Sequence, residues 1–183
     1  MDDRMRFAVE MYEMALSRAF KSTLADFEEG EAEWRPVPES NNISLIVRHL
    51  AIEAQWHLDG LERGTAMPVH PSRELQHEID AMPVDFTANL AELTRLLHRF
   101  LERLRETTEE QLQARSASAY GERAVEWPHF LGYHQAIHLF GHLGQISMIR
   151  NLYRTTRGRS GFIQDNPTYP RSQNESEGRR REE

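Results

Sequence analysis

The chain has 183 residues, a length that fits one globular domain with a hydrophobic core. Its formal net charge of −7 argues against a nucleic-acid partner, and the absence of cysteine excludes disulfides, thiolate metal ligands and a cysteine nucleophile. No apolar run approaches the roughly 20 residues that span a bilayer, and the first residues lack the layout of a secretory signal. We therefore expect a cytoplasmic protein without a membrane partner.

Four segments space their apolar residues at helical intervals. These predicted helices cover residues 4–27, 43–61, 86–104 and 127–154. On the first of them, Phe7, Met11 and Met14 are expected to face the core. A run of capping residues that ends at Asn42 precedes the second. The pattern predicts an all-α protein, a four-helix bundle whose sites are built from inward-facing side chains.

The connections between these helices differ in length and composition. Three prolines interrupt residues 63–83, which predicts a long crossover between the second and third helices. Residues 117–125 fit a small hairpin before the fourth helix. The chain after residue 154 is rich in Gly, Ser, Arg, Asn and Pro. We therefore expect a bundle domain over residues 1–154 and a flexible polar tail over residues 155–183.

Three histidines carry the strongest chemical signal in the chain. His138 and His142 are four residues apart on the fourth predicted helix, so both imidazoles lean to one side and can share an ion. A third imidazole, from His49 on the second helix, would complete a set of three neutral nitrogens with one position left open for water or substrate. His134 and His138 form an alternative pair, which periodicity alone favours slightly because it is more central on the inward stripe.

The inward face of the fourth helix follows from a wheel of about 100° per residue. His134, His138 and His142 share one sector with Gln145 and Ile149, and burying so many polar groups costs several kcal/mol unless each finds a partner. A metal ion would supply that partner. The residues predicted to lie well away from this sector are Leu139, Leu143 and Arg150.

Other titratable residues are assigned by their position on the predicted helices. Glu53 lies one turn after His49 on the same face, where its carboxylate can ligate an ion directly or orient an imidazole. His57 lies about 80° from that face and is expected to be exposed. His98 lies among charged residues of the third helix and is expected to be solvated.

Over residues 1–153 the sequence resembles the DinB/YfiT-like superfamily of small bacterial metal-binding four-helix proteins. The resemblance rests on the run WRPVP that begins at Trp34, on the run that ends at His49, and on HLFGHLGQ from His138 to Gln145. It implies that His49, His138 and His142 bind a divalent ion, zinc or nickel, and so it selects the 138/142 pair.

The resemblance also has a departure and further implications. Many members carry a histidine directly before the last ligand and an arginine directly after it, where this chain has Gly141 and Leu143. Members of known chemistry include thiol-dependent transferases and isomerases, and others are described as hydrolases. A small-molecule substrate, a low-molecular-weight thiol as cosubstrate and a homodimer are therefore expected.

Two residues are candidate catalytic groups in such a site. Glu53 is expected to orient a ligand or accept a proton, and Gln145 to hydrogen-bond a ligand or the substrate. Because the chain has no cysteine, any thiol nucleophile must come from a cosubstrate. Two alternatives stay open at this point: a non-catalytic, metal-stabilised bundle that acts as a binding module, and a scaffold that has lost its metal.

Overall fold

The structure, a computed structural model, describes residues 3–63, 84–108 and 135–160, and all regular elements in these ranges are helices. The first helix is continuous through α1 (Asp3–Met14), the π-helical turn η1 (Ala15–Phe20) and α2 (Lys21–Thr23). The other helices are α3 (Ile43–Arg63), α5 (Phe86–Glu106) and α7 (Gln135–Thr155). The predicted all-α, four-helix class is confirmed.

Several predictions fall outside the described residues. They are the course of the crossover (64–83), the hairpin (117–125), the start of the fourth helix (127–134) and the tail from residue 161. Within the described ranges, no helix combines the length and hydropathy that would let it cross a membrane.

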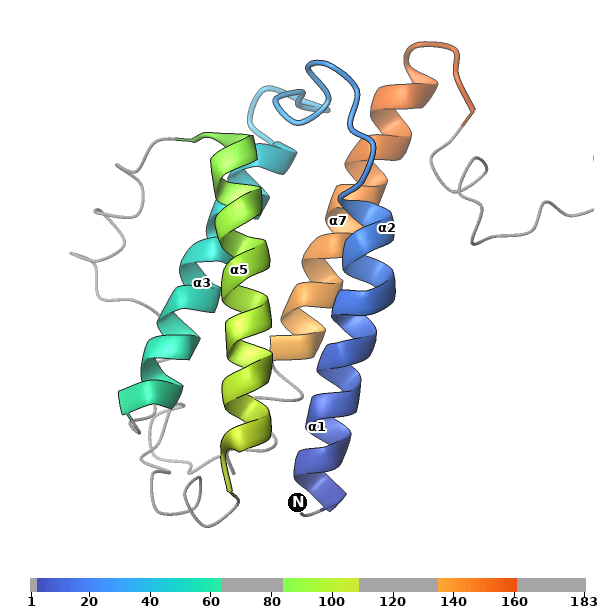
Figure 1. Cartoon of the computed structure of the whole chain (residues 1–183). Helices are drawn as coiled ribbons and strands as arrows, with labels where there is room; N and C mark the ends of the chain where they lie inside the picture. The colour runs from blue at the N-terminus through green and yellow to red at the C-terminus, as the bar shows by residue number, and fades with distance from the viewer. Residues whose placement is uncertain (1–2, 64–83, 109–134, 161–183) are drawn as a thin grey trace, which may run out of the picture.

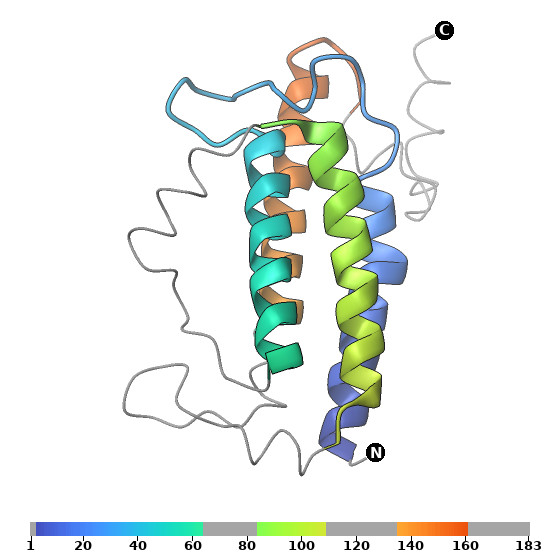
Figure 2. The ribbon, with the colours of Figure 1, turned by 60° about the vertical axis from the view of Figure 1, so that its left-hand side comes forward.

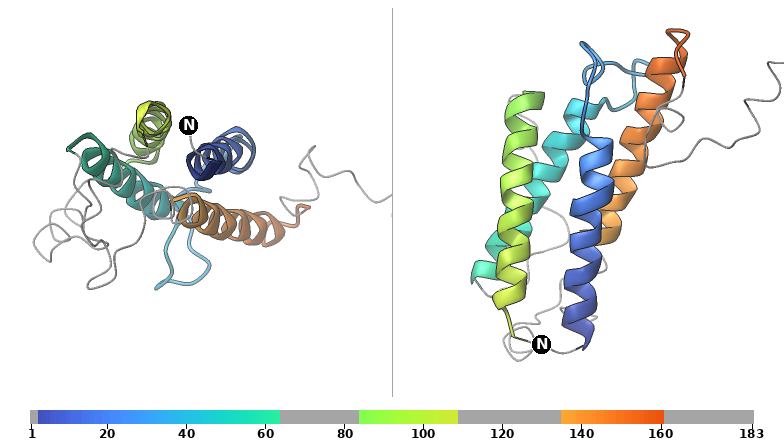
Figure 3. Two further views of the ribbon diagram at one scale, coloured as in Figure 1. Left: turned by 90° about the horizontal axis from the view of Figure 1, so that it is seen from below. Right: turned by 45° about the vertical axis from the view of Figure 1, so that its right-hand side comes forward.

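The four helices form two layers. In the axial view of Figure 3, α3 and α7 make one layer and α5 and α1 the other. Figure 2 shows the same arrangement from the side, with α7 behind α3 and α1 behind α5. In Figure 1 the chain ascends through α1, descends through both α3 and α5, and ascends again through α7. Helices α3 and α5 therefore run in the same direction, and the end of α3 and the start of α5 lie at opposite ends of the bundle.

Helix α5 shows most clearly why the sequence folds in this way. Asp85 caps its start, since the side chain accepts a hydrogen bond from the Ala88 backbone N–H at 2.9 Å. Two arginines, Arg103 and Arg105, lie in its last turn, where the helix dipole favours cations. Its apolar residues recur every three or four positions and are buried: Leu93, Leu96, Leu97, Phe100, Leu101 and Leu104.

Helix α3 begins where the capping run predicted. The Asn42 side-chain oxygen accepts a hydrogen bond from the Leu45 backbone N–H at 2.9 Å. Ser44 ties the same end to the preceding loop through a hydrogen bond from its hydroxyl to the Ala32 carbonyl at 3.2 Å. These bonds fix the start of the helix that carries His49 and Glu53.

The predicted inward face of the first helix was wrong at two positions. Phe7 is 57% exposed and Met14 is 42% exposed. The buried stripe is instead formed by Met5, Val9, Tyr12 and Leu16. This helix has apolar residues on two faces, and the face that contains Tyr12 packs inward, with the Tyr12 ring 5.1 Å from that of Phe100.

The predicted inward face of the fourth helix was also wrong. Gln145 is exposed, and the three residues that were placed away from the core are buried: Leu139, Leu143 and Arg150. The core face of α7 follows the apolar residues between the histidines, so His138 and His142 lie at its border, half-buried against α3. Ile149 is buried, as predicted.

Arg150 is the centre of a buried clasp at the upper end of the bundle. Its guanidinium, 0% exposed, donates to Glu31 Oε1 at 2.7 Å and to the carbonyls of Thr23, Ala25 and Asp26 at 2.7–2.8 Å. It also lies 4.2 Å from the centre of the Phe27 ring. The clasp joins α7 to the loop that follows α2, and it satisfies a charge that would otherwise be costly to bury.

Candidate metal centre

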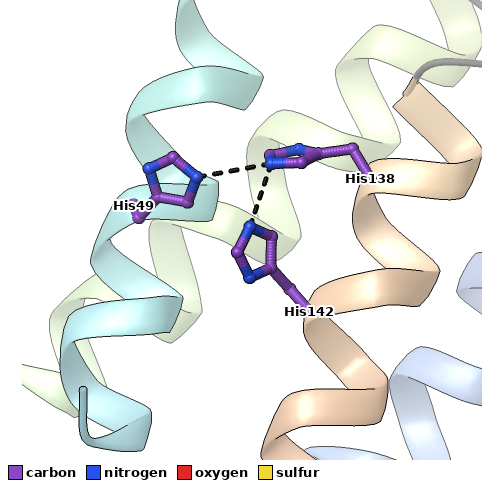
Figure 4. Close-up of side chains that lie close together, drawn as sticks. All are labelled: His49, His138 and His142. Atoms are coloured by element: carbon purple, nitrogen blue, oxygen red, sulfur yellow. Dashed lines mark hydrogen bonds between the residues drawn. The ribbon is translucent and has the colours of Figure 1, made fainter. Parts of the chain in front are cut away.

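Three imidazoles from two helices meet between α3 and α7 (Figure 4). His49 comes from α3, and His138 and His142 come from successive turns of α7. The His138 Nε2 atom lies 3.3 Å from His49 Nε2 and 2.9 Å from His142 Nε2. One nitrogen from each ring therefore points to the same small volume, and the candidate ligand atoms all lie within 4.8 Å of one another.

The spacing of these nitrogens fits one small divalent ion. Three nitrogens at about 2.0–2.1 Å from a tetrahedral ion lie roughly 3.3–3.4 Å from one another. The observed separations of 3.3 and 2.9 Å are close to that value. The ring planes of His49 and His138 cross at 80°, and those of His138 and His142 at 85°. The three rings surround a common point and do not stack, which suits a facial set of ligands.

The outer nitrogens of the α7 pair bond to acceptor oxygens. His138 Nδ1 lies 3.1 Å from Glu53 Oε2, and His142 Nδ1 lies 2.9 Å from Gln145 Oε1. Such partners fix the orientation and tautomer of a histidine ligand and raise its basicity. Glu53 also approaches the third imidazole, with its Oε1 atom 3.6 Å from His49 Nε2.

These outer bonds determine which atoms face the common point. With Glu53 ionised, both Nδ1 atoms carry the proton that the oxygen accepts, and a neutral imidazole has only one proton. The two Nε2 lone pairs of His138 and His142 then face each other at 2.9 Å. That contact is repulsive by itself and becomes attractive when a cation lies between the nitrogens.

Burial sets the charge of two residues in the centre. It lowers the pKa of His49 to about 4, with a further contribution from the nearby His142, so His49 is neutral at pH 7 and its one unprotonated nitrogen can bind a cation. Burial also raises the pKa of Glu53 to about 7 in the protein without metal. A carboxyl group with this pKa can gain or lose a proton near neutral pH.

The remaining histidines and the tryptophans have other surroundings. His57 was predicted to be exposed, which was wrong: it is 6% exposed, and its Nδ1 lies 2.6 Å from the Glu53 carbonyl oxygen. His98 is exposed, as predicted. Trp34 packs against Tyr153 with ring centres 5.7 Å apart, which is a structural contact.

Two further residues bear on the site. Trp56, on α3 with His49, is buried, and its indole nitrogen has no hydrogen-bond partner within the described part of the chain. The alternative ligand His134 lies outside the described residues. The structure therefore offers no comparison between the 134/138 and 138/142 pairs.

The comparison with protein families agrees with the fold. The sequence profile of the DinB superfamily matches residues 13–146, which is well over half of the chain. The matched segment includes His49, Glu53, His138, His142 and Gln145. The chain belongs to the DinB superfamily. No curated protein and no solved structure gives a significant match.

Proposed function

We propose that the protein is a metal-dependent enzyme that activates a low-molecular-weight thiol or water against a small electrophilic substrate. The observation that carries this proposal is the convergence of three imidazole nitrogens from His49, His138 and His142. A divalent ion held there would lower the pKa of a thiol or water molecule in its open position and so supply a nucleophile near neutral pH. Zinc and nickel are the ions we expect, because both accept imidazole ligands.

In this proposal Glu53 has two tasks. Its Oε2 atom lies 3.1 Å from His138 Nδ1, where it can accept a hydrogen bond from that nitrogen and so hold the His138 Nε2 toward the other two rings. Its Oε1 atom, 3.6 Å from His49 Nε2, lies at the edge of the same volume. A carboxylate in that position can accept the proton that a thiol or water gives up, and its pKa of about 7 matches this role.

Gln145 performs the corresponding task for the other α7 ligand. Its side-chain oxygen lies 2.9 Å from His142 Nδ1, and a hydrogen bond donated by that nitrogen would leave Nε2 for the ion. Because Gln145 is exposed, its amide N–H groups can also donate to a substrate that binds beside the histidines. The chain itself has no cysteine, so the thiol of a transfer reaction is a cosubstrate.

The experiment that tests this function compares two nucleophiles in one protein. Metal-stripped protein is reloaded with zinc or with nickel and is then incubated with a small thiol and an aryl chloride, or with an activated ester in water. We expect metal-dependent turnover in one of the two assays, with its loss in His138→Ala and its retention in the matched control His98→Ala. Equal rates with and without a chelator would contradict the mechanism.

The same experiment separates the second candidate function. A protein that binds metal stoichiometrically in a His138-dependent manner, yet turns over neither substrate pair, would be a metal-binding bundle that acts through a partner. We favour the enzyme because the three-imidazole set leaves a coordination position for a reactant. A cytoplasmic location and a homodimeric state are further parts of this proposal.

A further inference from the structure

One buried hydrogen-bond donor on α3 has no part in the proposed function. Trp56 is 7% exposed, and its indole Nε1 has no hydrogen-bond partner within the described part of the chain. An indole N–H can donate but cannot accept. A donor that is buried without an acceptor has lost its hydrogen bonds to water, and few such groups occur in folded proteins. An acceptor atom on a bound ligand would remove that cost.

Other buried polar side chains receive their partners from the protein itself. Asn42 and Ser44 bond to the preceding loop and to the first turn of α3. His57, the next residue after Trp56, is buried to the same degree, and its Nδ1 lies 2.6 Å from the Glu53 carbonyl oxygen. These groups are paired as the fold requires. Trp56 differs from them, because its donor is buried and the described residues offer it no acceptor.

Trp56 shares one side of α3 with the two groups of this helix that the proposed function uses. At about 100° per residue, Glu53 lies roughly 40° from His49, and Trp56 lies roughly 20° from it in the other direction. The three residues follow one another at intervals of four and three, so they form a row that extends about 10 Å along the helix axis. Along this row lie a candidate metal ligand, a candidate base and an indole donor.

We propose that the Trp56 indole N–H binds a neutral acceptor oxygen, an amide or ketone carbonyl, of the molecule whose reacting atom occupies the open position of the ion. This inference rests on the proposed function, because it requires the ion at His49. Helix side chains lean toward the N-terminus, so the acceptor is expected roughly 6–10 Å from the reacting atom. A neutral oxygen is favoured because the Glu53 carboxylate lies between the two positions and repels a second carboxylate. The bound molecule is therefore extended, with a carbonyl remote from its reacting end.

The first experiment tests this spacing in the native chain with a series of thiols. Cobalt(II) accepts imidazole ligands as zinc does, and its visible absorption changes when a thiolate joins them. In the ω-mercaptoamides from mercaptoacetamide to mercaptooctanamide, we expect an affinity maximum at the length that reaches Trp56, roughly three- to tenfold above the shortest member. An affinity that is flat, or that rises steadily with length as apolar contact alone would cause, would overturn the proposal. An equal maximum for the matching ω-mercaptocarboxylates would contradict the neutral acceptor.

The second experiment tests the donor itself. Trp56→Phe keeps an aromatic ring and removes the N–H, so the length-dependent gain should disappear while mercaptoacetamide and cobalt bind as they do to the native chain. Trp34→Phe is the matched control and should keep the gain, because Trp34 packs against Tyr153 and lies outside the row on α3. A gain that survives in Trp56→Phe would overturn the proposal. An equal loss of affinity for every thiol in the series would also overturn it, since the ring would then be structural.

The same titrations separate a failure of this inference from a failure of the proposed function. If mercaptoacetamide binds to the cobalt ion but the affinity maximum is missing, only the Trp56 contact is wrong. If the chain binds cobalt and no thiol changes its spectrum, the activation of a thiol is contradicted, and this inference fails with it. If the chain binds no cobalt, the metal centre itself is contradicted.

Discussion

Helix α7 carries two polar clusters, and they differ in how completely their groups are paired. Near its end, Arg150 is fully buried and bonds to Glu31 and to three backbone carbonyls. Near its start, His138 and His142 are half-buried, and their Nε2 atoms face each other and His49. The first cluster pairs a charge with acceptors in every direction, whereas the second brings three imidazole nitrogens together around a point that could hold a cation.

This difference indicates different roles for the two ends of the helix. A buried and saturated ion pair holds α7 to the loop after α2 and leaves no atom for a ligand. A half-exposed group of imidazoles contributes little to folding by itself, and in the proposed function it takes a metal ion from solution. The clasp thus fixes the position of α7, while the proposed function places the chemistry at the histidines and Glu53.

The largest expected effect comes from opening the clasp. Arg150→Met leaves the buried Glu31 carboxylate without its cation, and we expect a loss of about 3–5 kcal/mol in the free energy of unfolding. Urea denaturation measures this loss. The double variant Arg150→Met with Glu31→Leu is expected to recover much of it, since no charge is then buried alone. A loss below about 1 kcal/mol in the single variant would show that the clasp is not structural.

Removal of a histidine should lower metal affinity and leave the stability of the metal-free protein unchanged. His138→Ala is expected to lower affinity for zinc at least about a hundredfold while the metal-free protein keeps its stability, because the ring is a ligand and not a core residue. Calorimetric titration measures the affinity, and the melting temperature without metal measures the fold. His98→Ala controls for the loss of an imidazole elsewhere. Unchanged affinity in His138→Ala would argue against the site.

Loss of the orienting carboxylate should have a smaller effect on binding. Glu53→Gln keeps the size of the side chain but weakens its hydrogen bond with His138 Nδ1, and we expect roughly a 10- to 100-fold loss of metal affinity. Competition with a chelator of known affinity measures this change. An affinity equal to that of the native chain would mean that Glu53 does not orient the ligand.

The pH dependence of metal affinity should reveal the titration of the Glu53 carboxyl group. Without metal the pKa of Glu53 is raised to about 7, and the metal-bound form requires the carboxylate, so binding below pH 7 must release its proton. Affinity is expected to rise about tenfold per pH unit up to about pH 7 from this group and to level off above it. The His49 pKa of about 4 adds no slope above about pH 5. The Glu53→Gln variant should lose this rise of metal affinity with pH. A pH dependence identical to that of the native chain would contradict the assignment of the titration to Glu53.

Much of the fold follows from local patterns in the sequence. The boundaries of α3 and α5 could be predicted because a cap at Asn42 and regular apolar spacing from Phe86 to Leu104 act within a few residues. The inward face of α7 could not be predicted correctly, because the histidines were taken as the centre of its core-facing side. The packing of Leu139 and Leu143 instead set that face, and the histidines lie at its edge.

The candidate site could be predicted from the sequence only in part. The spacing of His138 and His142 indicates a shared direction on one helix, but only the family resemblance selected this pair and His49 as ligands. The buried Arg150 has no local signal, because arginine is rarely buried and its partner Glu31 is 119 residues away in the chain. His57 was also missed, since its burial depends on the packing of neighbouring segments and not on its position relative to His49.

X-ray absorption spectroscopy of the metal-loaded protein tests the central claim most directly. We predict one divalent ion per chain, with a first shell that contains three imidazole nitrogens at about 2.0–2.1 Å. In His138→Ala this shell should lose an imidazole or the ion should be absent. A protein that takes up no stoichiometric metal, or an ion whose shell contains no imidazole, would contradict the claim.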